Sequence, residues 1–247
     1  LLSVFHNRRW DADFLTAQDL LAQGTLGRIT EARLHFDRFR PVVRERWREG
    51  AGPGAGLWSD LAPHLLDQAL QLFGWPESLQ ADLMTLRDGG LSDDAFECRL
   101  RYANGLRVTL GASMLMALPG PRFALHGTLG SWVKHGLDTQ EDALKAGLRP
   151  DLTQPQAWGI DPQCGQLALL QGDGTVQATL HANLNGRWPT FYAALRDAIR
   201  GRGQNPVPAD GALRVLMLQD LGRVSAAQRR EMAVNPTPMN AQQESTT

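Results

Sequence analysis

Residues 47–68 have the sequence WREGAGPGAGLWSDLAPHLLDQ, in which a glycine-rich loop runs into an amphipathic segment. Glycine permits positive φ angles and lets a backbone approach a ligand closely, and the start of a helix carries unpaired N–H groups. Asp60 and His64 lie four residues apart, so they point to the same side of the predicted helix. This pair can hold a polar ligand and move a proton, but by itself it supplies no redox cofactor site.

Apolar residues recur at about 100° per residue between residues 57 and 73, which predicts an amphipathic helix in this segment. Pro63 is tolerated only in a first helical turn, which places the helix start near Ser59 or Asp60. Asp60 is then close to the N-cap position, where capping alone explains an aspartate. A catalytic Asp60–His64 pair and an ordinary polar helix face are therefore both open at this point.

The glycine loop does not match a dinucleotide-binding fingerprint. Its four glycines alternate rather than form G-x-G-x-x-G, Pro53 interrupts them, and the charged residues 44–48 stand where a buried strand is required. Trp47 and Arg48, at the start of the loop, are suited to stacking and to holding a phosphate or carboxamide. The six histidines are dispersed with no H-x-x-x-H pair, so no metal site is predicted.

Hydrophobic periodicity predicts both helices and strands around this segment. Asp13 is expected to cap a helix that ends at Gly24, a residue favoured just past a helix end. The next segment changes to period two, with Ala32, Leu34 and Phe36 on one side, which predicts a strand with one buried face.

The rest of the chain is predicted to be rich in sheet. Further strands are predicted at residues 79–86, 95–102, 106–112, 123–126, 131–134, 167–170 and 175–180. Short turn signals at residues 104–105 and 172–174 indicate antiparallel hairpins. Two helices are predicted to follow, over residues 189–200 and from residue 210 to about residue 225.

Composition excludes several classes of function. The chain has 247 residues and a formal net charge of −1, so it has no field that would gather nucleic acid or an anionic membrane. No apolar run is long enough to span a bilayer, and the first residues lack a signal-peptide pattern. Cys98 and Cys164 lie far apart and suggest neither a disulfide framework nor a zinc site. We therefore expect a cytoplasmic protein whose partner is a small molecule.

Five further segments carry expectations. Residues 1–5 are predicted to form a buried strand, and the polar residues 7–11 after it either contact a ligand or form an exposed basic turn. Residues 138–142 are typical of the acidic start of a short helix. Residues 147–165 are expected to form a long surface loop, and residues 235–247 are too polar to pack.

Taken together, these motifs resemble the carboxyl-terminal part of the Gfo/Idh/MocA oxidoreductases, the family of glucose-fructose oxidoreductase and inositol dehydrogenase. The resemblance covers roughly residues 1–234 and depends on the order and spacing of several weak motifs. They are residues 4–11, Trp47-Arg48, the glycine loop, Asp60 and His64 with Asp67, residues 191–199, and Gly127 to Ser131 followed by Lys134.

The resemblance implies how the chain is organised. In this family a Rossmann domain comes first, with a glycine fingerprint and a catalytic Glu-Lys-Pro motif, and neither is present here. Residues 1–7 are then expected to be the last strand of that missing domain, residues 8–234 a substrate-binding and oligomerisation domain, and residues 235–247 a flexible polar tail. The implied fold is α+β, with a large, mostly antiparallel open sheet, helices on one face, and a second subunit on the other.

The resemblance also implies an activity, the transfer of a hydride between nicotinamide and a sugar, polyol or related carbonyl compound. His64 is the implied general acid/base, since histidine titrates near neutrality and can exchange a proton with the substrate hydroxyl. Asp60 is implied to orient its imidazole. Without the Rossmann domain the chain is expected to be inactive by itself.

Binding roles follow for six more residues. The implied contacts to the cofactor, NAD or NADP, are Asn7, Trp47 and Arg48, and the implied substrate contacts are Arg9, Asp67 and Trp188. Trp188 stands where relatives often have Tyr, so a hydroxyl contact is not expected there. An alternative from another class is a sensor or assembly protein that keeps this fold without catalysis, because fold does not determine function.

Overall fold

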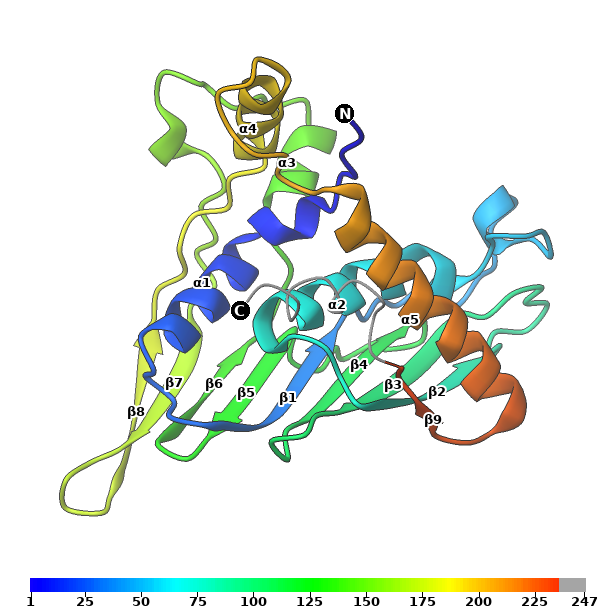
Figure 1. The fold of residues 1–247 in the computed structure, drawn as a ribbon, viewed down its shortest axis with the longest axis horizontal. Coiled ribbons are helices and arrows are strands. Elements are labelled where there is room, and N and C mark those ends of the chain that lie inside the picture. The colour runs from blue at the N-terminus through cyan, green and yellow to red at the C-terminus, as the bar shows by residue number, and fades with distance from the viewer. Residues whose placement is uncertain (236–247) are drawn as a thin grey trace, which may run out of the picture.

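The computed structural model describes residues 1–235 and contains one sheet of nine strands (Figure 1). The strands are β1 (Ile29–His35), β2 (Ser78–Met84), β3 (Ala95–Arg101), β4 (Arg107–Ser113), β5 (Phe123–Gly127), β6 (Gly130–Lys134), β7 (Gly165–Leu170), β8 (Val176–His181) and β9 (Met232–Ala233). Their order across the sheet is β8-β7-β6-β5-β1-β4-β3-β2-β9. Only β1 and β4 pair in parallel, so the predicted large, mostly antiparallel sheet is confirmed.

The helices pack on one face of this sheet, as predicted. They are α1 (Ala12–Ala22), α2 (Leu57–Phe73), α3 (Gln140–Lys145), α4 (Pro189–Ile199) and α5 (Ala209–Gln228), with three short 3-10 turns, η1 (Asn7–Trp10), η2 (Trp47–Glu49) and η3 (Pro155–Ala157). Figure 1 shows α1, α2 and α5 on the same side of the sheet, while α3 and α4 lie at one end, near the N-terminus. The opposite face of the sheet is left open.

The core lies between the sheet and helices α2 and α5. In β3, for example, burial alternates, and Phe96, Cys98 and Leu100 face the helices. Trp58 of α2 packs against α5 so closely that a Cβ at Gly222 would lie 2.3 Å from its ring. The two helices therefore act as one rigid layer, which holds the start of α2 in place.

The predicted start of α2 was wrong by two to three residues. The helix begins at Leu57, and Pro63 lies in its second turn rather than its first. Asp60 does not cap the helix; instead, Asp93 accepts a hydrogen bond of 2.5 Å from the backbone N–H of Trp58 through its carboxylate. A carboxylate from the loop between β2 and β3 thus stabilises the helix start.

A second capping prediction was also wrong. Asp13 lies in the first turn of α1, where its carboxylate is fully buried and paired with Arg122. The backbone N–H of Ala12 donates instead to Asp138, at 2.8 Å. The acidic start of α3 at residues 138–142 therefore has a second role, because Asp138 caps α1 from a distant part of the chain.

The two ends of the chain depart from the expectations in different ways. Residues 1–5 do not form a buried strand: Leu1 and Leu2 are exposed, and Ser3 makes one isolated bridge, to Pro208. Among the described residues, this segment has a pairing partner on one edge only, at residues 207–208. Its side chains therefore remain largely exposed. The predicted tail, residues 235–247, lies outside the described residues except for Asn235. None of the helices in residues 1–235 is long and apolar enough to cross a membrane.

Candidate active site

A cleft of about 320 Å³ lies at the start of α2. It is lined by Val4, Phe5, His6, Trp47, Arg48, Gly54, Ser59, Asp60, Pro63 and His64, and is called the His64 cleft below. The fold thus brings together four of the predicted site residues, from η2 and from α2. The cleft lining contains His6 rather than its neighbour Asn7, which begins η1.

The loop before α2 is held by a buried carboxylate. Glu49 accepts hydrogen bonds from the backbone N–H of Arg44, from Arg46 and from Arg87, the last at 2.9 Å. Burial opposes ionisation of Glu49, but these hydrogen bonds outweigh it and lower its pKa to about 2. Gly56, at a φ of 94°, then turns the chain into the helix, where Asp93 blocks any side chain. The glycine loop is therefore anchored at both ends.

His64 and His6 stand next to each other in the cleft. Their ring centroids are 6.3 Å apart, with the planes nearly perpendicular. Nδ1 of His64 and Nε2 of His6 are buried and have no hydrogen-bond partner among the described residues. Burial, together with the positive charges of Arg8, His6 and Arg122, lowers the pKa of His64 to about 3, and burial also lowers the pKa of His6. Both rings are therefore neutral at pH 7.

Asp60 faces Arg48 and not His64. Its Oδ1 lies 3.4 Å from Nε of Arg48, and within residues 1–235 no hydrogen bond joins it to the His64 ring. The orienting contact implied for Asp60 is thus not formed in this structure. Pro63, which has no N–H, leaves the carbonyl of Ser59 without its helical donor beside the same cleft.

Trp47 and Arg48 are the most accessible polar and aromatic groups of the cleft. The Trp47 side chain is 67% exposed, and the Arg48 guanidinium lies 5.0 Å from the centre of its ring. A stacked indole and guanidinium at an open rim fit a flat amide ring and a phosphate, respectively. These two residues are therefore available to hold a ligand that has a flat ring or an anionic group. No group of three or more His, Cys, Asp or Glu in residues 1–235 is arranged to bind a metal ion.

Arg9 and Asp67 bind each other. Two hydrogen bonds, of 2.8 and 2.6 Å, join the guanidinium to the carboxylate, whose side chain is 2% exposed. This bidentate pair ties η1 to α2. Its polar atoms are used in that contact, so the structure shows neither of the two facing the cleft as a free substrate contact.

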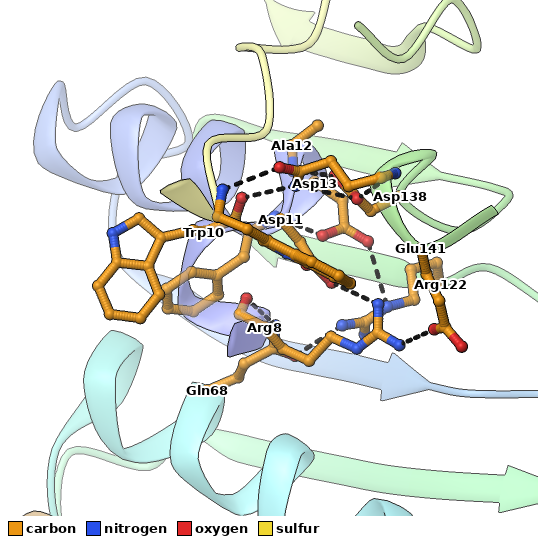
Figure 2. A network of polar contacts seen from close by, with 12 residues as sticks. Arg8, Trp10, Asp11, Ala12, Asp13, Gln68, Arg122, Asp138 and Glu141 are labelled. Atoms are coloured by element: carbon orange, nitrogen blue, oxygen red, sulfur yellow. Dashed lines mark hydrogen bonds and ion pairs between the residues drawn. The ribbon is translucent and has the colours of Figure 1, made fainter. Parts of the chain in front are cut away.

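Beneath the cleft lies a network of buried charges, shown in Figure 2. It consists of Arg8, Asp11, Asp13, Gln68, Arg122, Asp138, Gln140 and Glu141, and is called the buried polar cluster. Arg8 pairs with Asp11 at 3.3 Å and with Glu141 at 2.5 Å, and Arg122 pairs with Asp13 at 3.2 Å. Burial raises the pKa of Asp11 well above its ordinary value.

The cluster reaches the His64 cleft through Gln68, one turn after His64. Its side chain donates to the carbonyl of Arg8 at 3.0 Å and accepts from Arg122 at 2.6 Å. This places two guanidinium groups behind the imidazole, which is why their charges bear on its pKa. The orientation of α2 against η1 is thus set by buried hydrogen bonds.

Trp188 does not line the His64 cleft. Its indole N–H donates to buried Asp11 at 2.7 Å, and its ring borders a separate apolar cavity with Tyr192 and Phe5. The structure therefore separates it from the cluster of Trp47, Arg48, Asp60 and His64.

Sequence patterns gave no site role to His6 or Arg122, and they singled out Arg8 only as part of the polar segment 7–11. His6 directly precedes the polar segment 7–11, so its position was a signal that could have been used. Arg122 carries no local signal, because its partners Asp13 and Gln68 are far away in the sequence.

Comparisons with known proteins identify the family of the chain. Residues 14–133 match the family model described as the GFO/IDH/MocA C-terminal domain. The chain is 51% identical over 234 residues to the uncharacterized oxidoreductase YdgJ of Escherichia coli, covering 95% of this chain and 66% of that protein. It is 37% identical to IolW of Bacillus subtilis, an NADP(+)-linked scyllo-inositol 2-dehydrogenase, covering 93% of this chain and 63% of that protein.

Solved structures give the same result. The YPO2259 protein of Yersinia pestis superposes with a TM-score of 0.90 at 47% identity, covering 96% of this chain and 66% of that one. An oxidoreductase from Bacillus cereus superposes with a TM-score of 0.83 at 29% identity, covering 94% and 77%. The chain thus spans just under two thirds of the length of the first relatives it matches. It belongs to the Gfo/Idh/MocA family of oxidoreductases and contains the C-terminal domain of that family.

Proposed function

We propose that the protein to which this chain belongs is an NAD(P)-dependent oxidoreductase that acts on a CH–OH group of a sugar, polyol or related small carbonyl compound. Residues 8–234 are its substrate-binding part. The observation that carries this proposal is a neutral, buried imidazole at His64 in a cleft whose rim presents the free faces of Trp47 and Arg48.

His64 fits the role of general base. Oxidation of a hydroxyl to a carbonyl requires loss of the hydroxyl proton, and a neutral imidazole accepts one. Burial lowers the pKa of His64 to about 3, so its ring is neutral at pH 7, and the bound substrate must raise that pKa for the ring to take the proton effectively. Asp60, one turn earlier, is paired with Arg48 at 3.4 Å and would supply a negative charge to the protonated ring only on turning away from that pair.

The cofactor fits the same cleft. A bound nicotinamide dinucleotide supplies the acceptor or donor of the hydride. On this chain Trp47 and Arg48 would hold it, and the adjacent His6 imidazole is free to bond a substrate hydroxyl. The similarity to IolW, a scyllo-inositol 2-dehydrogenase that uses NADP(+), supports a polyol as the substrate class and NADP as a cofactor to test first.

The test is to replace His64 in a longer protein that contains this chain and is as long as the relatives. His64→Ala is expected to lower kcat for scyllo-inositol by roughly 10²–10⁴, as is typical when acid/base catalysis is lost. His181→Ala, on β8 and outside the cleft, is the matched control and is expected to leave kcat unchanged. Wild-type kcat in His64→Ala would exclude the role given to His64.

We also propose that the open face of the sheet binds a second copy of the chain. Leu170, Val176 and Leu180 are exposed on the face of β7 and β8 opposite to buried Leu167. Apolar side chains gathered on an open sheet favour burial against a partner. Light scattering is expected to give a dimer or larger oligomer for the wild type and a smaller species for Leu180→Glu; a monomeric wild type contradicts the proposal.

A further inference from the structure

His6 and His64 each have a buried nitrogen that forms no hydrogen bond within residues 1–235. These atoms are Nε2 of His6 and Nδ1 of His64. Both are covered by the described residues themselves, so their lack of a partner does not come from an open surface. Buried polar atoms are nearly always paired, and two unpaired nitrogens on adjacent rings therefore require an explanation.

The other nitrogen of His64, Nε2, opens into the His64 cleft. It is not one of the buried unpaired atoms, and within residues 1–235 it makes no hydrogen bond. A substrate hydroxyl can therefore reach Nε2 but not Nδ1. To accept a proton, Nε2 must hold a lone pair. Because a neutral imidazole has a single N–H, its hydrogen must then be on Nδ1, and His64 can act as a base only in this tautomer.

The Nδ1–H of this tautomer needs an acceptor, since a buried N–H without one is unfavourable. The charged groups around His64 do not supply it. Arg8 and Arg122 have only donors. Both oxygens of Glu141 are engaged, by Arg8 at 2.5 Å and by Lys145 at 2.6 Å.

The two carboxylates of α2 nearest to His64 in the sequence are occupied as well. Asp60 faces Arg48, with its Oδ1 lying 3.4 Å from Nε of that residue. Asp67 accepts from Arg9 through both of its oxygens, at 2.8 and 2.6 Å. Of the titratable side chains considered around this imidazole, Nε2 of His6 is left as the free acceptor.

The position of His6 suits this role. The ring centroids of His6 and His64 lie 6.3 Å apart with nearly perpendicular planes, so the edge of one ring points at the other. One water molecule is long enough to bridge this separation, and a small ring rotation closes it to a direct bond. Burial lowers the pKa of His6, so its neutral ring has one nitrogen free to accept.

The residues after His6 are fixed against α2. Arg9 is bonded to Asp67 through two hydrogen bonds. Gln68 donates to the carbonyl of Arg8 at 3.0 Å. Both contacts join η1 to the turn of α2 that follows the proposed base. Buried, paired groups therefore hold the two imidazoles beside each other.

We propose that His6 is a positioning residue for His64: its Nε2 accepts the Nδ1–H of His64, directly or through one water molecule, and so keeps Nε2 of His64 free for the substrate proton. This inference rests on the proposed function, because it explains how the same base is kept in its accepting tautomer. The Nδ1–H of His6 remains able to donate to a substrate hydroxyl. Since water bonds the same N–H in the unfolded chain, the contact orients the ring and adds little to stability. His6 thus takes the orienting role that the resemblance implied for Asp60.

The test determines the tautomer of each histidine in the purified chain by long-range proton–nitrogen NMR at pH 8, without cofactor or turnover. We expect the hydrogen of His64 on Nδ1. In His6→Leu, which has no acceptor, it is expected on Nε2, where water can accept it. In His6→Gln, whose amide oxygen can accept, it is expected on Nδ1 again. His35→Leu, on β1 and outside the cleft, is the matched control and leaves the His64 signals unchanged. His126, bonded to Ser131 at 2.8 Å, is the internal reference.

Turnover in the longer protein should follow the tautomer. His6→Leu is expected to lower kcat roughly tenfold, which corresponds to about one hydrogen bond, and His6→Gln to recover most of this loss. Should His6→Leu fail to fold, His6→Phe, which keeps a ring without an acceptor, takes its place.

Three NMR results would overturn the inference: a hydrogen on Nε2 of His64 in the wild type, the same His64 tautomer in His6→Leu as in the wild type, or a His6→Gln chain that behaves like His6→Leu. Because the NMR readout needs no turnover, it is independent of the kinetic test of His64. A His6-dependent tautomer together with an active His64→Ala enzyme would support the orienting contact and reject the base.

Discussion

The buried polar cluster and the His64 cleft are adjacent and differ in how their polar groups are paired. In the cluster, the cations Arg8 and Arg122 each have a carboxylate within 3.3 Å, although Nε and Nη1 of Arg122 and Oδ2 of Asp13 make no hydrogen bond within residues 1–235. In the cleft, the buried Nδ1 of His64 and Nε2 of His6 have no partner among the described residues. Both regions use η1 and its neighbours, since His6 enters the cleft and Arg8 enters the cluster.

This difference indicates which buried groups stabilise the fold and which are available to bind a ligand. Buried polar groups are nearly always hydrogen-bonded, so a paired buried charge is explained by the fold itself. A buried nitrogen without a partner is a cost to the fold, and such groups gather where a ligand is bound. The cluster is thus expected to govern stability, and the cleft to govern activity. Substitutions in the cluster should therefore lower the free energy of unfolding, and substitutions in the cleft should lower kcat with little effect on stability.

Arg122→Met should cause the largest loss of stability. It leaves the fully buried Asp13 without its ion pair, and an unpaired buried charge typically costs about 3–5 kcal/mol. Urea denaturation should show this drop in the free energy of unfolding, and the double variant Arg122→Met with Asp13→Leu should recover much of it. Arg196→Met breaks an exposed pair and should change the value by less than about 0.5 kcal/mol. A loss below 1 kcal/mol in Arg122→Met would contradict the structural role of the cluster.

Glu49→Gln should have a smaller effect, confined to acid. The pKa of Glu49 is about 2 in the folded protein against 4.5 when unfolded, so its contribution is complete above pH 4.5 and is lost as pH falls towards 2. At pH 7 we expect Glu49→Gln to be roughly 2 kcal/mol less stable than the wild type. The gap should close on acidification, measured as urea midpoints from pH 7 to pH 2. A gap independent of pH would mean that the Glu49 charge is not what holds the loop; exposed Glu97→Gln serves as the control.

The strands and α2 could be predicted from the sequence because each has its own period. Alternation in segments such as Ala95 to Arg101 requires only that one side of a strand be buried, and hairpin turns such as Asn104-Gly105 then dictate antiparallel neighbours. The pairing of β1 beside β4 and β5 has no such local signal, since it joins residues 76 to 98 positions apart.

The helix starts could not be predicted, because the groups that cap them come from elsewhere. A local aspartate was the natural candidate at both helices, yet Asp93 caps α2 and Asp138 caps α1. Sequence patterns register the carboxylate nearest in the chain and not the one nearest in space. The freed Asp13 and Asp60 then bind Arg122 and Arg48.

The candidate site shows the same limit. The spacing of Asp60 and His64 predicted correctly that both would lie on one side of α2, where they line one cleft with Trp47 and Arg48. The polar segment after residue 6 was singled out, but a 3-10 turn such as η1 has three residues per turn and presents successive side chains in different directions. Which of them reach the cleft depends on pairing with Asp67 and Glu141, which only the folded chain reveals.

His64→Ala should have the smallest effect on stability, in contrast to its large effect on turnover. Nδ1 of His64 has no hydrogen bond to lose, and alanine favours a helix interior by a few tenths of a kcal/mol over histidine. At pH 8 the two proteins should therefore unfold within about 0.5 kcal/mol of each other.

Acid should then favour the variant. His64 has a pKa of 6.5 in the unfolded chain and of about 3 in the folded protein. Between these pH values the unfolded wild type binds a proton at His64 and the folded wild type does not, so the free energy of unfolding falls as pH falls from 6.5 to 3. His64→Ala lacks this loss, and its stability relative to the wild type should rise as pH falls through that window. Urea midpoints at pH 8 and pH 5 measure the effect. If the variant were instead less stable at both pH values by an equal amount, the imidazole would be a packed element of the core, and the division between a paired cluster and an unpaired cleft would fail.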